Sequence, residues 1–267
     1  MFVKMAIGTH KGGVGKTTSV FNLSAAYAQM GFKVLCVDCD AQGDLSWAFR
    51  KDHQELELTV ANIFTEDGCF TEDLIQPTEF ENISIICADR RLDNVQQTSN
   101  FADNPLVTEL ANALEDVRED YDVVLFDCPP GAHLSLYAAM VAADIVLCPL
   151  EPGVLSIKSV ASLRADIDEI RQHWNADVEF RYFLSRAGKN KASEDAYAAL
   201  CDTVGKQHVI QARLPSLTTF NNSLTTGIPV AIKSPKSKPT GYIYELATEI
   251  LDGGEDSGSE EDHQAAA

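Results

Sequence analysis

Residues 10–19 read His-Lys-Gly-Gly-Val-Gly-Lys-Thr-Thr-Ser. An apolar run at 2–8 precedes them and a helical pattern at 20–28 follows them, so the order is strand, glycine-rich loop and helix. In that order, the backbone N–H groups of the loop and of the helix start can point at anionic oxygens. The stretch therefore predicts a phosphate-binding loop, in which Lys16 reaches the β- and γ-phosphates and the Thr17 hydroxyl ligates Mg²⁺.

The loop departs from the usual phosphate-loop pattern in two ways. That pattern, G-x-x-x-x-G-K-[ST], places glycine at position 10, where this chain has His10. The chain also carries a second lysine, Lys11, five residues before Lys16. Two lysines supply more positive charge than one nucleotide site needs. A solvated loop charge is the simpler interpretation of Lys11, and the other motifs favour a functional one.

Three motifs carry a resemblance to a known family. The stretch at 11–18, Lys-Gly-Gly-Val-Gly-Lys-Thr-Thr, resembles the deviant Walker A loop of the ParA/MinD family of P-loop ATPases. The stretch at 34–46, which contains Asp-Cys-Asp-Ala-Gln-Gly-Asp, resembles that family's second-strand motif, V-D-x-D-P-Q-G-N. The stretch at 123–131, which ends Asp-Cys-Pro-Pro-Gly, resembles its Walker B and switch II segment. The similarity runs from about residue 3 to residue 251, and the short, Soj-like ParA proteins are the most similar branch.

The resemblance implies ATP and Mg²⁺ as cofactors and assigns roles to individual residues. Asp40 positions or activates the attacking water, and it forms the catalytic set with Lys11 and Lys16. Thr17, Asp38 and Asp127 support Mg²⁺, with Asp127 acting through a bound water. The resemblance also places a contact to the adenine base at Pro215, and the alternative is that this residue belongs to an ordinary loop. The implied nucleotide contacts are Lys11, Gly12, Gly13, Val14, Gly15, Lys16, Thr17, Thr18 and Pro215.

The resemblance also implies a homodimer that forms when ATP is bound. Lys11 corresponds to the family's signature lysine, which crosses the dimer interface and touches the partner's phosphates. A cation that is delivered only on dimerisation couples the nucleotide state to assembly. A side chain at Gly12 would crowd the same interface. Hydrolysis is then expected to be slow and to be stimulated by a ParB-like or cargo-adaptor protein.

Alternating strand and helix patterns predict the fold. Continuous apolar runs at 123–126 and 145–147 are typical of central strands in a parallel sheet covered on both faces. We expect an α/β fold, a doubly wound and mostly parallel sheet with helices on both faces, whose ligand loops gather at the carboxyl ends of the strands. The expected strands are 2–8, 33–38, 83–87, 122–127, 144–149, 179–184 and 208–212, and the expected helices are 16–30, 44–50, 59–64, 104–119, 134–141, 156–173, 192–205 and 239–251.

A single P-loop ATPase domain is expected over residues 1–251, with an acidic, disordered tail at 252–267. The loop begins ten residues into the chain, so we expect no helix-turn-helix domain before it. The seven cysteines are scattered, mostly in apolar runs, which indicates a reduced, cytoplasmic protein. Cys36 and Cys39 stand three apart on one strand, so their thiols should face opposite sides of the sheet.

The charge of the chain bears on its partners. The net charge is −19, and the tail contributes six of the acids, which is an awkward balance for a protein that holds DNA phosphates. Basic residues still cluster at 181–191 and 233–238. The resemblance implies non-specific, ATP-dependent DNA binding and a nucleoid-associated location, with solvated surface as the alternative. DNA-binding relatives commonly carry arginines after the position of Pro215, where this chain has Ser216-Leu-Thr-Thr. The candidate DNA contacts are Arg186, Lys189, Lys191, Lys236 and Lys238.

Other members of the superfamily offer alternative functions. A MinD-like protein binds membrane through a basic amphipathic C-terminal helix, whereas this chain is acidic after Leu251, so we expect no membrane partner. A metabolic or reductase-type enzyme, similar to the nitrogenase iron protein or the cobyrinate amidases, is a second alternative. Cys128 follows Asp127 directly, but no matching exposed cysteine and no glutamine-amidotransferase motif is evident. A regulatory binder without turnover would not need Lys16, Thr17, Asp40 and Asp127 intact.

Overall fold

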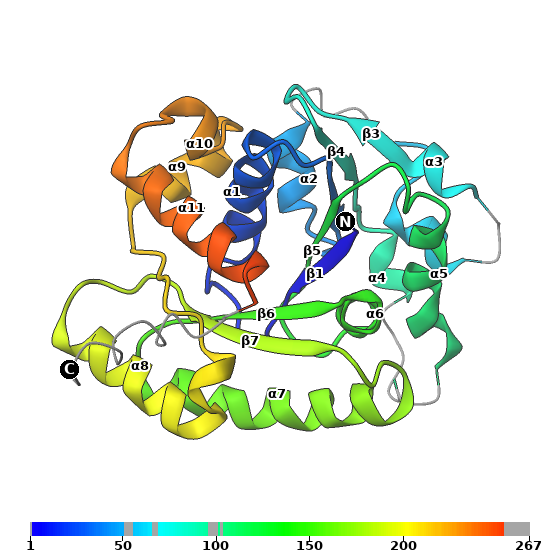
Figure 1. The fold of residues 1–267 in the computed structure, drawn as a ribbon. Coiled ribbons are helices and arrows are strands. Elements are labelled where there is room, and N and C mark those ends of the chain that lie inside the picture. The colour runs from blue at the N-terminus through cyan, green and yellow to red at the C-terminus, as the bar shows by residue number, and fades with distance from the viewer. Residues whose placement is uncertain (1, 51–55, 66–68, 96–100, 102–103, 254–267) are drawn as a thin grey trace, which may run out of the picture.

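The structure is a computed structural model that describes residues 2–50, 56–65, 69–95, 101 and 104–253, leaving out the side chains of residues 154–159. The acidic tail expected at 252–267 lies outside these residues from position 254 on. A central sheet runs through the molecule, with helices on either side of it (Figure 1).

Seven strands form the sheet in the order β3-β4-β2-β5-β1-β6-β7. All neighbouring pairs are parallel except β3 with β4. The expected doubly wound, mostly parallel α/β fold is confirmed. The strands are β1 (Val3–Ile7), β2 (Val34–Asp38), β3 (Ile75–Pro77), β4 (Ile83–Ile86), β5 (Val123–Asp127), β6 (Ile145–Leu150) and β7 (Glu179–Leu184).

The two faces of the sheet bury two separate hydrophobic clusters. Side chains alternate along each strand, so Leu35 and Val37 of β2 enter one cluster while Val34 and Cys36 enter the other. Cys39 belongs to the first cluster and Cys36 to the second, which confirms that these thiols face opposite sides. Helices contribute to the clusters on both sides of the sheet.

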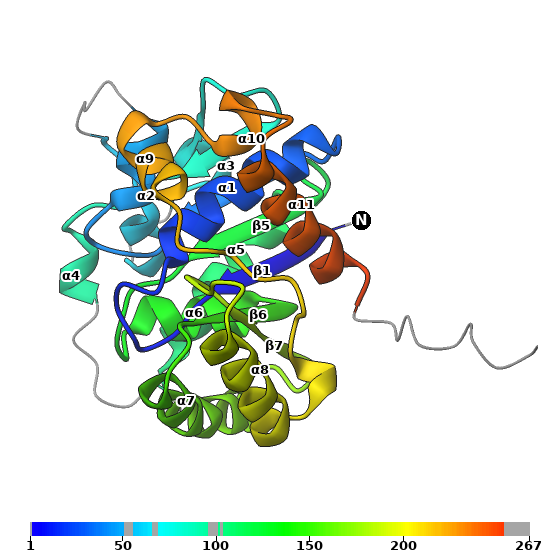
Figure 2. The ribbon, with the colours of Figure 1, turned by 90° about the vertical axis from the view of Figure 1, so that its left-hand side faces the viewer.

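Each face has its own set of helices (Figure 2). The face with Val34 is covered by α1 (Lys16–Gln29), α2 (Asp44–Phe49), α9 (Thr218–Thr226), α10 (Val230–Lys233) and α11 (Lys238–Leu251). The face with Leu35 is covered by η1 (Val60–Phe64), α3 (Thr71–Leu74), α4 (Leu92–Val95), η2 (Pro105–Thr108), α5 (Glu109–Glu115), α6 (Leu134–Ala142), α7 (Val154–His173) and α8 (Lys191–Val204). A short turn of 3₁₀ helix, η3 (Lys206–His208), follows α8.

One strand prediction is wrong. The segment 208–212 forms no regular strand, and its one isolated bridge within the described residues joins Val209 to Tyr182. A second isolated bridge, from Leu214 to Ser185, lies just after the segment. The backbone N–H groups of Gln211 and Ala212 donate to the Glu249 carboxylate, at 2.6 and 2.8 Å. Because a side chain takes these donors, they cannot join a strand ladder.

Two other expectations need adjustment. The helix expected at 104–119 consists of η2 and α5 and ends at Glu115. The sequence patterns missed β3, a three-residue edge strand that ends at Pro77, and the short helices α3, α4, α9 and α10. Proline lacks the N–H that a further ladder bond would need, which explains why β3 stops there.

The sheet register places the site. Asp38 at the end of β2 lies beside Asp127 at the end of β5, and Ile7 at the end of β1 lies on the other side of Asp127. The segments that follow these strands, at 8–15, 39–43 and 128–133, therefore meet at one edge of the sheet. This edge, at the carboxyl ends of the strands, is where open α/β sheets bind ligands.

Candidate nucleotide-binding site

The phosphate loop at 8–15 joins β1 to α1. Gly13 and Gly15 have φ of 77° and 90°, a left-handed conformation that side chains disfavour. Gly15 stands at the N-cap of α1 and has no side chain with which to cap the helix. Ser185 Oγ, at the end of β7, holds the loop by donating to Val14 O at 2.6 Å. The N-terminus of α1 is thus open toward an anion, whose charge the helix dipole favours.

The two lysines of the loop have different environments. Lys16 is 7% exposed, and its Nζ lies 3.3 Å from Lys11 O. Burial lowers the pKa of Lys16, and nearby acids, Asp127 first among them, oppose this change. Lys11 is partly exposed, with its Nζ 3.4 Å from Glu151 Oε2. Glu151 follows β6 and also binds Arg186 Nη1 at 3.0 Å through Oε1.

Asp127 is the group best suited to act on a metal ion. It is 1% exposed, and neither of its oxygens makes a hydrogen bond within the described residues. Burial and the neighbouring Asp38 raise the pKa of Asp127 well above its usual range, while Thr17 and Lys16 lower it. A buried carboxylate without a partner is costly, and a cation coordinated nearby would relieve that cost. The residues present therefore fit Mg²⁺ between Thr17 and Asp127.

Asp38 is buried as well, but its oxygens are engaged. Oδ2 accepts from Ser46 N at 2.9 Å and from Ser46 Oγ at 2.7 Å, and Oδ1 accepts from Asp40 N at 3.1 Å. Burial raises the pKa of Asp38 to about 7, and the bonds from Ser46 and Asp40 oppose the rise. Asp38 thus holds the start of α2 against β2. A direct metal contact from Asp38 stays a prediction.

The chain turns directly after Asp38 instead of continuing as an extended segment. Asp40 N donates back to the Asp38 carboxylate, and Asp40 Oδ1 accepts from Gln42 N at 2.9 Å. Gly43 closes the turn with φ of 68°. Asp40 is partly exposed, so its carboxylate lies at the rim of the site, where a water could reach it. Its role in activating that water stays a prediction.

The switch segment contacts the phosphate loop through its backbone. Gly131 N donates to His10 O at 3.0 Å, and Gly131 has φ of 86°. Pro129 and Pro130 precede it, so a stiff pair of residues is followed by a flexible one. A displacement of this segment would act directly on the residue before Lys11.

A narrow cavity of about 30 Å³ lies beside the loop. Pro215, the predicted base contact, lines it together with Val14 and Leu214. Phe220 of α9 and Ile243 of α11 also line it, and the sequence analysis missed both. Ile243 lies in the helix expected at 239–251, but nothing in the sequence singled out either residue. At about 30 Å³ the cavity is too small to hold a base as it stands, so the base contact at Pro215 stays a prediction.

The candidate DNA contacts divide into two groups. Lys189, Lys191, Lys236 and Lys238 are exposed. Arg186 is also exposed, but it pairs with Glu151 and lines the cavity beside the phosphate loop. Two other arginines are neutralised within the fold: Arg181 is buried against Glu179 and Ile250 O, and Arg213, which lies between the two basic segments, pairs with Glu194.

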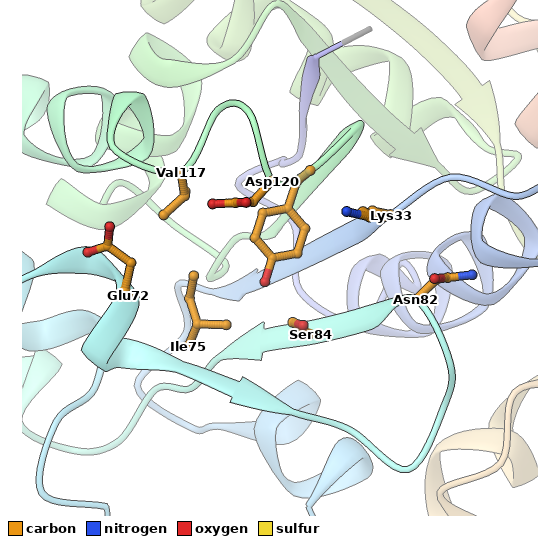
Figure 3. Close-up of a pocket in the computed structure, with 8 residues that line it drawn as sticks. Lys33, Glu72, Ile75, Asn82, Ser84, Val117 and Asp120 are labelled. Carbon is orange, nitrogen blue, oxygen red and sulfur yellow. The ribbon is translucent and has the colours of Figure 1, made fainter.

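A larger hollow of about 430 Å³ lies at the other end of the sheet (Figure 3). Lys33 precedes β2, Ser84 lies in β4 and Asp120 precedes β5, so the hollow opens at the amino ends of the strands. None of its lining residues belongs to the phosphate loop. It plays no part in the site built above.

Residues 3–180 match the model of a protein family described as AAA domain. The chain belongs to this family. Its loop and its two aspartate motifs are those of a ParA/MinD-type P-loop ATPase. The sporulation initiation inhibitor protein Soj of Bacillus subtilis is 27% identical over 256 residues, which cover 94% of this chain and 98% of Soj. The chromosome partitioning protein ParA of Caulobacter vibrioides is 28% identical over 275 residues, which cover 98% and 97%.

A solved structure shares the fold of this chain. The ATP complex of a Cyanothece McdA variant matches with a TM-score of 0.81 at 21% identity, over 94% of this chain and 96% of that one. At that identity the match shows the shared fold. Across the part of the chain that the structure describes, no helix has the length and apolar character needed to cross a membrane.

Proposed function

We propose that this protein is an ATP-dependent, dimerising ParA-type ATPase that partitions or positions DNA or protein cargo. Nucleotide binding brings two copies together through the phosphate-loop face, and hydrolysis of ATP separates them. The proposal rests on the geometry of residues 11–16 and on the similarity to Soj, ParA and McdA.

The observation that carries the proposal is the glycine at position 12. Gly13 and Gly15 need glycine because their φ is positive, whereas Gly12 has no such constraint. A Cβ on Gly12 would meet only Pro130 Cβ, at an ordinary contact distance of 3.6 Å. A Cβ at Gly12 therefore fits within a single copy of the chain. The absence of one there is explained by a close approach from outside, and a second copy at this face supplies it.

The chain's own groups divide the work of hydrolysis. The N-terminus of α1 and Lys16 hold the phosphates, and Asp40 at the rim orients the attacking water. Mg²⁺, held by Thr17 and aided by Asp127, supplies positive charge against the γ-phosphoryl oxygens. Lys11, delivered from the opposite copy, adds a second cation to the same charge. Because that cation arrives only on dimerisation, turnover depends on assembly.

The proposed partners follow from the surface. Lys189, Lys191, Lys236 and Lys238 supply exposed positive charge for DNA phosphates in an acidic protein. A basic segment of a ParB-like or cargo-adaptor protein suits the remaining acidic surface and would stimulate hydrolysis.

The iron-protein alternative is not favoured by the site. Cys128 is 1% exposed, and burial raises the pKa of its thiol well above the usual range. A cysteine that bridges a cluster between two subunits must reach the surface as a thiolate. Cys128 satisfies neither condition.

Hydrolysis by the wild-type protein and by Asp40→Ala, with and without DNA, tests the proposal. We expect Mg²⁺-dependent turnover in the wild type and binding of ATP without turnover in Asp40→Ala. Equal turnover in both proteins would contradict the proposed role of Asp40. No binding of ATP by either protein would reject the proposal as a whole.

A further inference from the structure

His10 replaces the glycine of the usual phosphate-loop pattern, and the function proposed above does not use its side chain. Its ring Nε2 lies 2.8 Å from Asp166 Oδ2, and both atoms are shielded from water. The contact joins the phosphate loop to α7, at a point 156 positions along the chain. The two atoms meet at ion-pair distance without the alignment of a hydrogen bond.

A third residue completes the contact. Tyr137 of α6 donates from its hydroxyl to Asp166 Oδ1 at 2.8 Å. The Tyr137 ring stacks on Phe101, with centroids 4.2 Å apart, so the tyrosine has little freedom. Asp166 is therefore fixed between two elements, the phosphate loop through His10 and α6 through Tyr137.

The backbone of His10 faces the catalytic side. His10 O accepts from Gly131 N of the switch segment at 3.0 Å. The next carbonyl, that of Lys11, lies 3.3 Å from Lys16 Nζ. One residue thus contacts the switch segment through its backbone and α7 through its side chain.

The polar contact is not needed to pack α7. That helix is attached to the core by apolar side chains of its own, including Val160, Leu163 and Ile167. Interactions of this kind hold a helix against a sheet, but they allow small sliding motions. The short contact between His10 Nε2 and Asp166 Oδ2 fixes one position along the helix.

From these contacts we propose that His10 is a positioning residue, which fixes the phosphate loop and the switch segment against α7 through Asp166 and Tyr137. The proposal rests on the ATPase function proposed above and adds a regulatory connection to it. When nucleotide displaces the switch segment, His10 transmits the displacement to α7. Without His10, the carbonyl groups at positions 10 and 11 lose their anchor, and Lys16 is held less accurately at the moment of phosphoryl transfer.

Hydrolysis kinetics give the first test. We expect His10→Ala to lower kcat about tenfold and to leave KM for ATP within about twofold, because misplacement by a fraction of an ångström affects the transition state most. His10→Gln keeps an amide donor and should recover most of kcat. His10→Ala combined with Asp166→Ala should be no slower than either single variant, since both remove the same contact. Asp168→Asn, an exposed change on the same helix, is the matched control and should not alter kcat.

Hydrogen exchange gives a second test that needs no turnover. A non-hydrolysable ATP analogue should slow exchange at 8–16 and at 160–170 in the wild type, but only at 8–16 in His10→Ala. Slowing at both segments in His10→Ala, or additive kinetic effects of the two substitutions, would overturn the proposal.

The outcomes separate the two proposals. If the analogue slowed hydrogen exchange in α7 only when His10 is present, while the protein showed no turnover of ATP, that result would reject the ATPase function and keep the connection. Turnover that neither the His10 variants nor Asp166→Ala alters would keep the function and reject the connection. A wild-type protein that binds no nucleotide would overturn both, because His10 would then have no site to position.

Discussion

Lys11 and Glu151 form an ion pair across the mouth of the phosphate loop, with Nζ 3.4 Å from Oε2. The lysine that is proposed to act on a second copy is thus paired within its own copy in this structure. Glu151 also binds Arg186, which lines the cavity beside the loop. One carboxylate therefore neutralises two cations that could otherwise act on phosphates.

Glu151→Gln should release Lys11 for the partner copy. A partly exposed ion pair is worth about 0.2–1 kcal/mol, and a dimer contains two of them, so the ATP-bound dimer should form at a concentration about two- to thirtyfold lower. Sedimentation at several protein concentrations with a non-hydrolysable ATP analogue measures this. Glu194→Gln, which removes the Arg213 ion pair on α8, is the control. A weaker dimer in Glu151→Gln would mean that the carboxylate acts in the dimer itself.

Gly12→Val should fold normally and fail to dimerise. The new side chain starts 3.6 Å from Pro130 Cβ, so the melting temperature should change by less than about 4 °C. Gly13→Ala is the contrasting variant, because φ of 77° at Gly13 costs a side chain about 1–2 kcal/mol. Calorimetry and light scattering distinguish the two. If Gly12→Val formed a dimer with bound nucleotide, the second copy would not approach closely at Gly12.

Asp127→Asn should remove much of the stabilisation that Mg²⁺ adds to the ATP complex. The substitution also replaces a buried carboxyl group whose oxygens have no hydrogen-bond partner within the described residues, so the nucleotide-free protein should be at least as stable as the wild type. Thermal unfolding with ATP, with and without EDTA, measures both effects. If Mg²⁺ raised the unfolding temperature of the Asp127→Asn complex as much as that of the wild type, the ion would be held without this carboxylate.

Replacement of four exposed lysines should weaken DNA binding. Lys189→Ala and Lys191→Ala remove one pair, and Lys236→Ala and Lys238→Ala remove the other. Each phosphate contact that is lost should lower the slope of log affinity against log salt by about 0.9. Gel shifts with ATP and Mg²⁺ at several salt concentrations measure the slope, and Lys33→Ala, at the opposite end of the sheet, is the control. An unchanged slope in all four variants would place DNA binding elsewhere or exclude it.

The fold was predictable because its strands carry continuous apolar runs and its loop carries glycines. These signals are local, and they located six strands and the phosphate loop. The prediction of a strand at 208–212 was wrong because the backbone N–H groups of Gln211 and Ala212 donate to Glu249, which is distant in the sequence. The β3 strand was too short to leave a pattern.

The site was predictable only as far as its motifs reached. The sequence pointed to Asp38 and Asp127 together, and it could not show that Ser46 engages one of them while the other has no partner. The contact of His10 with Asp166 was equally hidden, because the two residues meet only through the packing of α7 against the loop. Long-range pairs of this kind leave no spacing in a single sequence.

The mass of the protein in solution with Mg²⁺ and a non-hydrolysable ATP analogue tests the central claim most directly. Light scattering after gel filtration should give about twice the mass of one chain with the analogue, and the mass of a single chain with ADP or without nucleotide. Lys11→Ala should bind the analogue and remain single. A wild-type protein that binds the analogue and stays single would contradict the account.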